Sequence, residues 1–358
     1  MKLEDPKVRR EHDPSGMLDL IARFPQMCRE AWDLGWAAQV PAARPSTVVA
    51  MGMGGSGIGG DLLKAVLFDD DAPPVASVKE YRAPGFARSG ALVFACSYSG
   101  NTEETLAAYE EARRRGATCV AVTSGGELLR LAREREHPAV VVPGGLPPRA
   151  ALPYLFLPML AVLGRAGLIR SYAEEVREAI DVLSRIVASE HPDRSAGTAR
   201  AIAGRLAGRI PVIYSAGPFL EPAAERWKDQ FNENSKTFAV WNTFPELNHN
   251  ETVGWGLDDA LARIMHVIIL HDAIEDPRLS RRVTITKDLA FARAGAVDEV
   301  RAQGQGKLAR LLSAILVGDF VSWYLATLRG MDPTPVNVID ELKRRLAAIA
   351  ETRKRGSA

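Results

Sequence analysis

One stretch of the sequence, ALVFACSYSGNTEETL at residues 91–106, constrains the fold more than any other. It begins as a β-rich apolar run, continues through a turn that holds Ser97, Ser99 and Thr102, and ends in a helical pattern. The first N–H groups of such a helix lack intrahelical partners, and the helix dipole adds positive charge. With Gly100 admitting close approach, the three hydroxyls predict a cup for phosphate or another small oxyanion. The alternative is a loop whose hydroxyls only cap the helix.

The segment STVVAMGMGGSGIGGDLLKAVL at residues 46–67 repeats this design. A short apolar strand leads into a loop with Gly55 and Ser56, and a helix follows. Further strands are expected at residues 76–78, 118–123 and 139–142. Strands that alternate with helices form βαβ units in a parallel sheet, and such sheets bind ligands at the carboxyl ends of their strands. We therefore expect an α/β fold in which both loops meet at one edge of a sheet.

The second half of the chain has the same order of elements but little sequence in common with the first. Strands are expected at residues 209–215, 238–241, 262–270 and 297–302, and helices at residues 219–231 and 308–328. Its first loop, SAGPF, lacks the hydroxyl cluster, so only the first half is equipped to hold a phosphate. Each half is predicted to be an αβα sandwich of flavodoxin-like or Rossmann-like type.

The predicted domains span residues 1–168, with a leading helix, and residues 169–358, with a linker helix and a C-terminal helix. Residues 143–169 begin as a Pro/Gly loop and become strongly apolar. Because Pro153 and Pro158 lie inside the apolar part, we expect a broken buried helix after the loop rather than one long straight helix. Residues 172–189 have the pattern of a solvated helix that connects the halves.

The composition limits which classes of partner the protein is expected to bind and in which cellular compartment it is expected to lie. The 45 Lys and Arg residues nearly balance the 44 Asp and Glu residues, for a net charge of +1. This balance provides no field for nucleic acid or for an anionic membrane, so anion binding has to be local. The first 14 residues lack the apolar core of a signal peptide, and no run approaches the ~20 apolar residues of a membrane span. Cys28, Cys96 and Cys119 form no CxxC pair, which indicates reduced thiols in a cytoplasmic protein.

The loop GMGGSG at residues 52–57 also fits the dinucleotide fingerprint GxGxxG between a strand and a helix. Glu80 follows the second strand, somewhat further along than the usual acidic residue. Ser56 stands where close approach to a pyrophosphate favours a small side chain, and a second hydroxyl loop belongs to the same strand ends. One compact phosphorylated ligand suits the two loops better than an extended dinucleotide does.

A third polar cluster, KDQFNENSKTFAVWNTFPELNHNETVGW, spans residues 228–255. Glu233 lies at the end of an expected helix, where the helix dipole disfavours a carboxylate, and His249 lies between two asparagines in a loop. Singly, each can be a solvated surface residue. Together with a phosphate cup, a carboxylate and an imidazole resemble an acid/base pair that acts on a phosphorylated substrate.

Metal binding is the other common use of histidine. His266 and His271 are five residues apart in an expected strand, which places them on opposite faces. The remaining histidines have no ligand-like neighbours at useful spacing. We therefore expect no metal site.

The motifs as a set resemble the bifunctional phosphoglucose/phosphomannose isomerases, a two-domain branch of the phosphoglucose isomerase superfamily. The matching segments, in chain order, are GMGGSGIGGD, CSYSGNTEET, PPR at 147–149, NENSK, FPELNHNE, and DPTP followed by IDELK. The resemblance covers nearly the whole chain. It implies two sugar isomerase (SIS) domains and interconversion of glucose 6-phosphate and mannose 6-phosphate with fructose 6-phosphate. The implied route is a cis-enediol intermediate, with no metal and no other cofactor.

The same resemblance implies residue roles. The residues that would bind the sugar phosphate are Gly55, Ser56, Ser97, Ser99 and Thr102. Glu233 would move a proton between C1 and C2, and Arg149 would stabilise the enediolate. His249 would assist ring opening, and Lys343 would face the sugar ring. These residue types suit aldose–ketose isomerisation, which needs a base near C1 and C2, a proton shuttle and stabilisation of an enediolate oxygen.

The resemblance further implies a homodimer, because the family's histidine comes from the neighbouring subunit. Two other classes remain open. A non-catalytic SIS protein that senses sugar phosphates would usually carry a DNA-binding or partner-binding domain, and the sequence shows no basic recognition helix outside the two halves. A nicotinamide-dependent oxidoreductase would rest on GMGGSG alone.

Overall fold

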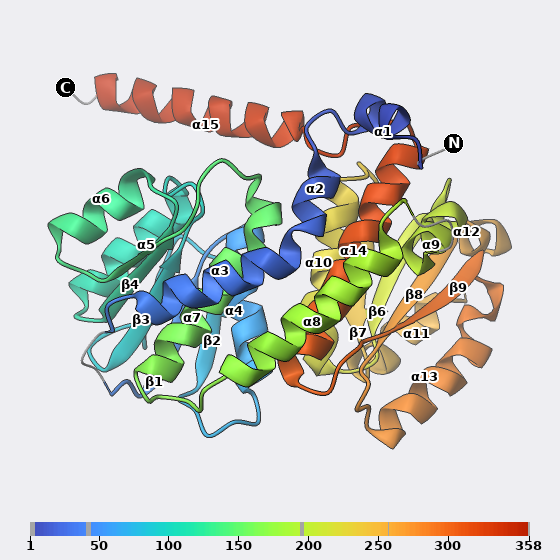
Figure 1. The fold of residues 1–358 in the computed structure, drawn as a ribbon, viewed down its shortest axis with the longest axis horizontal. Helices are drawn as coiled ribbons and strands as arrows, with labels where there is room; N and C mark the ends of the chain where they lie inside the picture. The colour runs from blue at the N-terminus through green and yellow to red at the C-terminus, as the bar shows by residue number, and fades with distance from the viewer. Residues whose placement is uncertain (1–3, 41–43, 194–196, 257, 357–358) are drawn as a thin grey trace.

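Two parallel sheets with flanking helices make up the computed structural model (Figure 1). The structure describes residues 4–40, 44–193, 197–256 and 258–356. Every strand pair in both sheets is parallel. The predicted α/β fold is therefore confirmed.

The first sheet has the strand order β2-β1-β3-β4-β5. Its strands are β1 (Thr47–Met51), β2 (Val75–Val78), β3 (Ala91–Cys96), β4 (Thr118–Thr123) and β5 (Ala139–Val141). The helices between them are α4 (Gly54–Leu67), α5 (Glu103–Arg114) and α6 (Gly126–Glu134). All six residues of β3 are buried, because both faces of this central strand are covered by helices. The carboxyl ends of β1 and β3 therefore open side by side where the strand order reverses.

The second sheet repeats this layout with four strands in the order β7-β6-β8-β9. The strands are β6 (Ile210–Ser215), β7 (Val240–Thr243), β8 (Met265–His271) and β9 (Ala296–Arg301). The helical elements of this half are η2 (Pro218–Leu220), α10 (Glu221–Glu233), η3 (Glu246–His249), α11 (Glu251–Gly254), α12 (Asp259–Arg263), α13 (Pro277–Leu289) and η4 (Phe291–Arg293). The four expected strands of this half are confirmed within a few residues.

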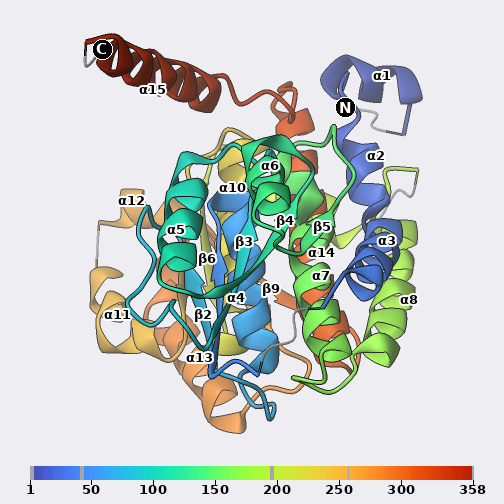
Figure 2. The ribbon, with the colours of Figure 1, turned by 90° about the vertical axis from the view of Figure 1, so that its left-hand side faces the viewer.

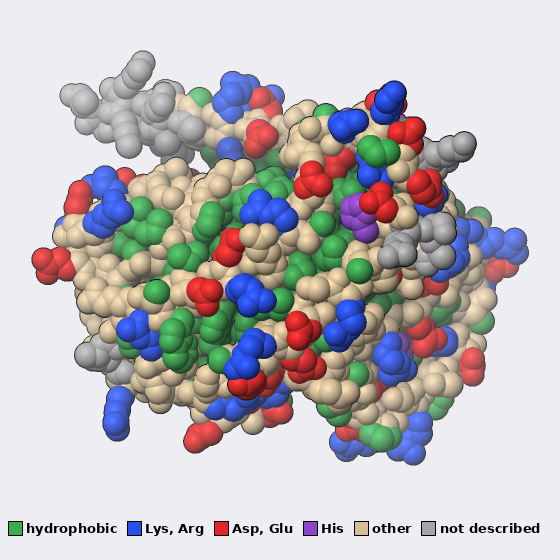
Figure 3. Space-filling view, viewed as in Figure 1, with side chains coloured by type: hydrophobic (Ala, Val, Ile, Leu, Met, Phe, Trp, Pro, Cys, Tyr) green, Lys and Arg blue, Asp and Glu red, His purple; other side chains and the backbone are tan. Residues whose placement is uncertain are grey.

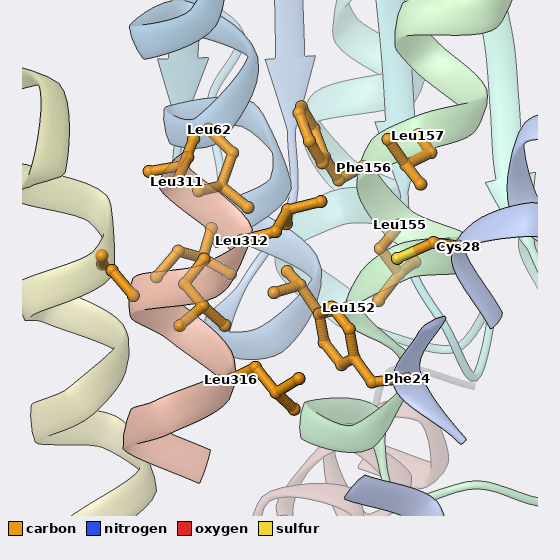
Figure 4. Close-up of a cluster of buried hydrophobic side chains, with 14 of the residues drawn as sticks. Phe24, Cys28, Leu62, Leu152, Leu155, Phe156, Leu157, Leu311, Leu312 and Leu316 are labelled. Atoms are coloured by element: carbon orange, nitrogen blue, oxygen red, sulfur yellow. The ribbon is translucent and has the colours of Figure 1, made fainter. Parts of the chain in front are cut away.

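A layer of long helices joins the two sheets. It contains α3 (Phe24–Ala37), α7 (Leu152–Arg165), α8 (Ala173–Glu190), α9 (Thr198–Leu206) and α14 (Lys307–Leu328). Helix α14 packs on α8, α9 and α10, while α3 packs on α7 and α8. The largest apolar cluster runs through this layer and reaches the inner faces of both sheets. Figure 4 shows Leu311, Leu312 and Leu316 of α14 beside Leu62 of α4 and side chains of α3 and α7. The halves thus share one core.

Two expectations about the connecting helices are wrong. Helix α7 is not broken at Pro158 but continues as one helix around it. A Cβ on Gly35 of α3 would lie only 2.5 Å from the Pro158 Cα, so close packing on α3 holds α7 at this point. Helix α8 is not simply solvated, because its face with Val176, Ile180 and Leu183 is buried in the central layer. The proposed domain boundary at 168/169 falls between these two helices.

The expectation that no apolar run approaches the length of a membrane span is wrong for helix α14. Its 22 residues are long and apolar enough to cross a membrane, by length and composition. However, 94% of its apolar window is buried inside the protein. Residues 308–327 are all buried, which is the pattern of a helix that is surrounded by protein on every side. Helix α14 is therefore the central helix of the shared core.

The first and last helices lie on one side of the molecule. Helices α1 (Pro6–His12) and α2 (Met17–Ala22) lead into α3, and α15 (Asn337–Gly356) projects from the body (Figures 1 and 2). Exposed apolar side chains of α15 include Val338, Leu342 and Leu346. Acidic and basic side chains are interspersed over the face drawn in Figure 3, in keeping with the balanced net charge.

Candidate active site

The two hydroxyl segments lie together at the carboxyl ends of β1 and β3. Gly55 and Ser56, which were expected in a loop, fall in the first turn of α4, whereas Ser97, Ser99 and Thr102 lie between β3 and α5. No side chain caps α4 or α5, so the hydroxyls do not serve as helix caps. Instead, the Ser97 and Thr102 hydroxyls bond each other at 2.8 Å, and the Ser99 Oγ accepts from the Asn101 N–H. Gly100 has a φ of +69°, and a Cβ there would lie 1.8 Å from the Gly125 oxygen. The cup therefore needs glycine at this position.

Tyr98 joins the two loops to the segment that follows β5. Its backbone N–H donates to the Ser56 Oγ at 3.1 Å, which ties the first loop to the second. Its hydroxyl donates to the Pro143 oxygen and accepts from the Leu146 N–H, at 2.8 and 2.9 Å. These bonds fix the chain that leads into η1 (Pro148–Ala151). Tyr98 belongs to the CSYSGNTEET motif, but the sequence alone does not indicate these bonds.

Gly55 brings the first loop against η1. A Cβ on Gly55 would lie 3.0 Å from the Pro148 oxygen and 3.2 Å from the Arg149 Cα. Any larger residue at position 55 would therefore push the hydroxyl loops away from Arg149. The structure thus places the proposed phosphate cup and the proposed enediolate cation side by side.

Arg149 is 3% exposed and bridges the two halves. Its guanidinium donates to the Asn234 Oδ1 at 2.6 Å, to Glu233 Oε2 at 3.3 Å, and to the backbone oxygens of Pro333 and Thr334 at 2.9 and 2.8 Å. Burial lowers the pKa of Arg149, while Glu233 opposes that shift. The planar fork of arginine matches such a divergent set of acceptors, which lysine cannot do.

Glu233 is the last residue of α10, and its side chain is 27% exposed. Burial raises the pKa of this carboxyl group, and the charge of Asp229 adds to the increase. Arg149, Arg226 and Lys343 oppose the shift with their positive charges. A carboxylate with a raised pKa, partly exposed and held beside a cation, has the properties of a general base.

A buried ion pair supports this arrangement from below. Arg226 of α10 pairs with Asp319 of α14 at 2.8 Å, and both side chains are 3% exposed. Arg226 also donates to the Arg149 carbonyl at 2.9 Å, and Gln230 donates to Asp319. Burial raises the pKa of the Asp319 carboxyl group. Sequence reasoning missed this pair, although a carboxylate inside the apolar run 308–328 was a usable signal.

Two of the sequence-predicted site residues, Lys343 and His249, are exposed. Lys343 is an exposed residue of α15, and its charge lowers the pKa of Glu233. His249 is exposed at the end of η3. Within the described part of the chain, no hydrogen bond or ion pair joins His249 to Glu233 or Arg149. The geometry therefore assembles the phosphate cup, Arg149 and Glu233, but not His249.

His266 and His271 each have a carboxylate partner. The His266 Nε2 lies 2.7 Å from Asp298, and the His271 Nδ1 lies 2.7 Å from Glu275. Among the described residues, no group of three or more His, Cys, Asp or Glu side chains is placed to hold a metal ion. The three cysteines are free and buried.

A second cleft, of about 730 Å³, opens at the carboxyl ends of β6 and β8. It is the counterpart in the second sheet of the cup in the first. Seven carboxylates line it, with three cations: Asp61, Asp69, Glu221, Glu225, Asp272, Glu275 and Asp276, with Lys64, Lys307 and Arg310. Such a lining disfavours a phosphate.

Comparison with known proteins adds sequence and fold evidence. Residues 196–346 match the model of the bacterial phospho-glucose isomerase C-terminal SIS domain. A bifunctional phosphoglucose/phosphomannose isomerase of Caldicellulosiruptor bescii is 39% identical over 339 residues, which cover 94% of this chain and all of that protein. Its counterpart in Thermoplasma acidophilum is 37% identical and covers 84% of this chain and 90% of that protein.

A solved structure described as a glucose-6-phosphate isomerase like protein of Thermus thermophilus matches the fold with a TM-score of 0.61 and 20% identity. The match covers 94% of this chain and 99% of that one. Since the identities with the two isomerases extend over most of the sequence, this chain belongs to the family of bifunctional phosphoglucose/phosphomannose isomerases, which are sugar-phosphate isomerases.

Proposed function

We propose that the protein interconverts glucose 6-phosphate and mannose 6-phosphate with fructose 6-phosphate through a cis-enediol, without a metal ion. The observation that carries the proposal is the contact of Arg149 with Glu233 at 3.3 Å, next to the hydroxyl loops. A base and a cation stand together where the reacting carbons of a sugar phosphate would lie. The phosphate, bound at the far end of the sugar, would fix the position of those carbons.

Each step has a residue with suitable chemistry. Ser97, Thr102 and the uncapped N-terminal N–H groups of α4 and α5 would hold the phosphate. Glu233 would remove the proton from C1 or C2 and return it to the other carbon. Arg149 would stabilise the negative charge that forms on the enediolate oxygen. Protein groups thus supply the base and the electrostatic stabilisation that the isomerisation requires.

The direct test is an assay of purified protein, with a chelator present, for conversion of fructose 6-phosphate to both aldose phosphates. We expect both products and no loss of rate with the chelator. If fructose 6-phosphate binds and is not converted, the protein is a sugar-phosphate sensor. If NAD(P) raises the melting temperature and sugar phosphates do not, GMGGSG is a dinucleotide site.

We further propose a cytoplasmic homodimer in which His249 completes the active site of the partner subunit. Two observations support it: His249 is exposed and, among the described residues, forms no hydrogen bond or ion pair with Glu233, and α15 presents exposed apolar side chains. Those side chains are Val338, Ile339, Leu342, Leu346 and Ile349. In such a dimer, His249 would open the sugar ring and Lys343 would face it.

Subunit mixing tests the shared site. The variants Glu233→Gln and His249→Ala are each expected to be inactive alone. In a two-fold dimer, mixing them in equal amounts after dissociation restores about a quarter of the sites, because a mixed dimer holds one intact pair. Light scattering gives the oligomeric mass. A monomer, or a mixture that stays inactive although mixed dimers form, would disprove the shared site.

A further inference from the structure

Lys236 is a lysine that the sequence motif NENSK contains but that no step of the proposed chemistry uses. It lies in the loop after α10, with a φ of +49°. Residues other than glycine and asparagine seldom adopt this backbone conformation. Its side chain is partly buried. A strained backbone and a partly buried ammonium both cost free energy, so the surrounding structure must stabilise this lysine strongly.

The Lys236 ammonium lies within hydrogen-bonding distance of four backbone oxygens from two separate parts of the chain, which share its three N–H donors. Two belong to the C-terminus of α10, those of Glu233 at 2.8 Å and Asn234 at 3.3 Å. The other two belong to Asp332 at 3.0 Å and Pro333 at 2.8 Å, about a hundred residues later. The side chain thus clamps the end of the catalytic helix to residues 332–334, which we call the strap.

The strap also accepts hydrogen bonds from the Arg149 guanidinium. The Pro333 oxygen accepts from both Lys236 and Arg149, and the Thr334 oxygen accepts from Arg149. The Asp332 carboxylate holds the turn of the strap by accepting from the Thr334 N–H at 2.9 Å. A shift of the strap would therefore move the cation relative to the base.

The charges at the C-terminus of α10 also indicate that Lys236 stabilises the position of Glu233. The last carbonyls of α10 carry the negative end of the helix dipole, which repels the Glu233 carboxylate. The Lys236 ammonium neutralises these carbonyls directly. Burial and the nearby Arg149 lower the pKa of Lys236 to about 8, while Asp332 and Glu233 oppose that shift. The ammonium thus remains mostly charged at pH 7.

We propose that Lys236 is a positioning residue that holds Glu233 and Arg149 in register by clamping the end of α10 to the strap. It does not touch the sugar in this account; it acts through the two residues that do. The strap continues into α15, so the same clamp sets the base of the helix that carries Lys343. This inference rests on the proposed isomerase activity.

The test compares Lys236→Met with the wild-type isomerase. We expect kcat to fall about 10- to 100-fold, because a misplacement of about 1 Å can have this effect. The KM for fructose 6-phosphate should stay within about twofold, since the phosphate cup belongs to other loops. Loss of the positive charge should raise the pKa of Glu233, so the acid limb of the kcat profile should move to higher pH.

Two further variants separate positioning from simple folding. Lys236→Arg keeps a cation that can reach the carbonyls, and it should recover part of the lost kcat without the shift of the acid limb. Arg329→Met removes a cation that donates to the Ser235 and Lys236 oxygens from outside the site, at 2.8 and 3.2 Å. This matched control should keep kcat within about twofold of the wild type.

The inference is overturned if Lys236→Met folds and keeps kcat within about twofold of the wild type. It is also overturned if Lys236→Met and Arg329→Met lower kcat and the melting temperature equally, with the acid limb in place. Should Lys236→Met fail to fold, Lys236→Gln is judged by the same criteria. A wild-type protein without isomerase activity would refute the proposed function instead.

Discussion

The two sheets present the same arrangement of strand ends and opposite chemistry. At the first sheet, the first turn of α4 offers Ser56 and has no acidic residue, and the loop after β3 offers Ser97 and Thr102. At the second sheet, the loop after β6 leads to Glu221 at the start of α10, in a cleft whose charged lining consists of seven carboxylates and three cations. Burial raises the pKa of Glu221 as it does that of Glu233.

The comparison teaches that α4 and α10 are used at opposite ends. In our account the N-terminus of α4 binds the phosphate, whereas the C-terminus of α10 carries the base. One active site then needs both halves, which agrees with the large apolar cluster that runs through both, although each sheet also has a smaller cluster of its own. The duplicated architecture supplies a binding half and a catalytic half.

The largest expected effect separates the two ends of α10. Glu233→Gln should lower kcat by about 10³- to 10⁴-fold, because the general base is lost, while binding of fructose 6-phosphate persists. Glu221→Gln, on the same helix in the second cleft, should leave kcat within about twofold of the wild type. Steady-state kinetics and calorimetric titration measure both. Equal losses in the two variants would erase the distinction between the clefts.

Removal of the bridging cation should have the next largest effect. Arg149→Met should lower kcat by about 10²- to 10³-fold, since the enediolate loses its stabilising charge. Arg149→Lys should recover little, because the Arg149 bonds leave from three separate nitrogens, Nε, Nη1 and Nη2, whereas lysine has one nitrogen.

The matched cation of the second cleft is the exposed Lys64. Lys64→Met should have the kinetics of the wild type, and a loss comparable with that of Arg149→Met would place the substrate in the wrong cleft.

The hydroxyl loop should affect binding more than turnover. The double variant Ser97→Ala/Thr102→Val removes two groups that would bond a charged phosphate, so kcat/KM should fall about 10- to 100-fold. Most of this loss should appear in KM. If KM stays unchanged for fructose 6-phosphate, the hydroxyl pair does not hold the phosphate.

The smallest effect concerns pH. The raised pKa of Glu233 means that the base becomes protonated at a higher pH than an ordinary glutamate, so kcat should already fall on the acid side above that range. Asp229 contributes to the raised pKa. Asp229→Asn should therefore move the acid limb to lower pH at nearly unchanged maximal kcat. A limb that moves upward, or not at all, would exclude Glu233 as the titrating base.

Local patterns were sufficient for the strands and the hydroxyl loops. Apolar runs such as residues 92–95 and 118–123 predicted buried strands, because parallel strands covered on both faces are continuously apolar. Glu233 and His249 stood out as an acid/base pair, whereas the adjacency of Arg149 to Glu233 depends on contacts across 84 residues. The roles of these residues followed from the resemblance to the family.

The features that the sequence did not predict all depend on tertiary contacts. Pro158 does not break α7, because the helix is buried and packed closely on α3. The face of α8 becomes core because α14 and α3 cover it. Lys236 shows no role in the sequence, since half of its acceptors come from residues 332–333. Such contacts arise only when distant segments meet.

The central claim is that Glu233, from the second half, transfers a proton on a sugar phosphate that the first half holds. The most direct measurement is incorporation of solvent deuterium at C2 of the aldose phosphates formed from fructose 6-phosphate in ²H₂O, followed by NMR. The account predicts incorporation with the wild type and none with Glu233→Gln, while both proteins bind the substrate. Deuterium incorporation by Glu233→Gln at the wild-type rate would contradict it.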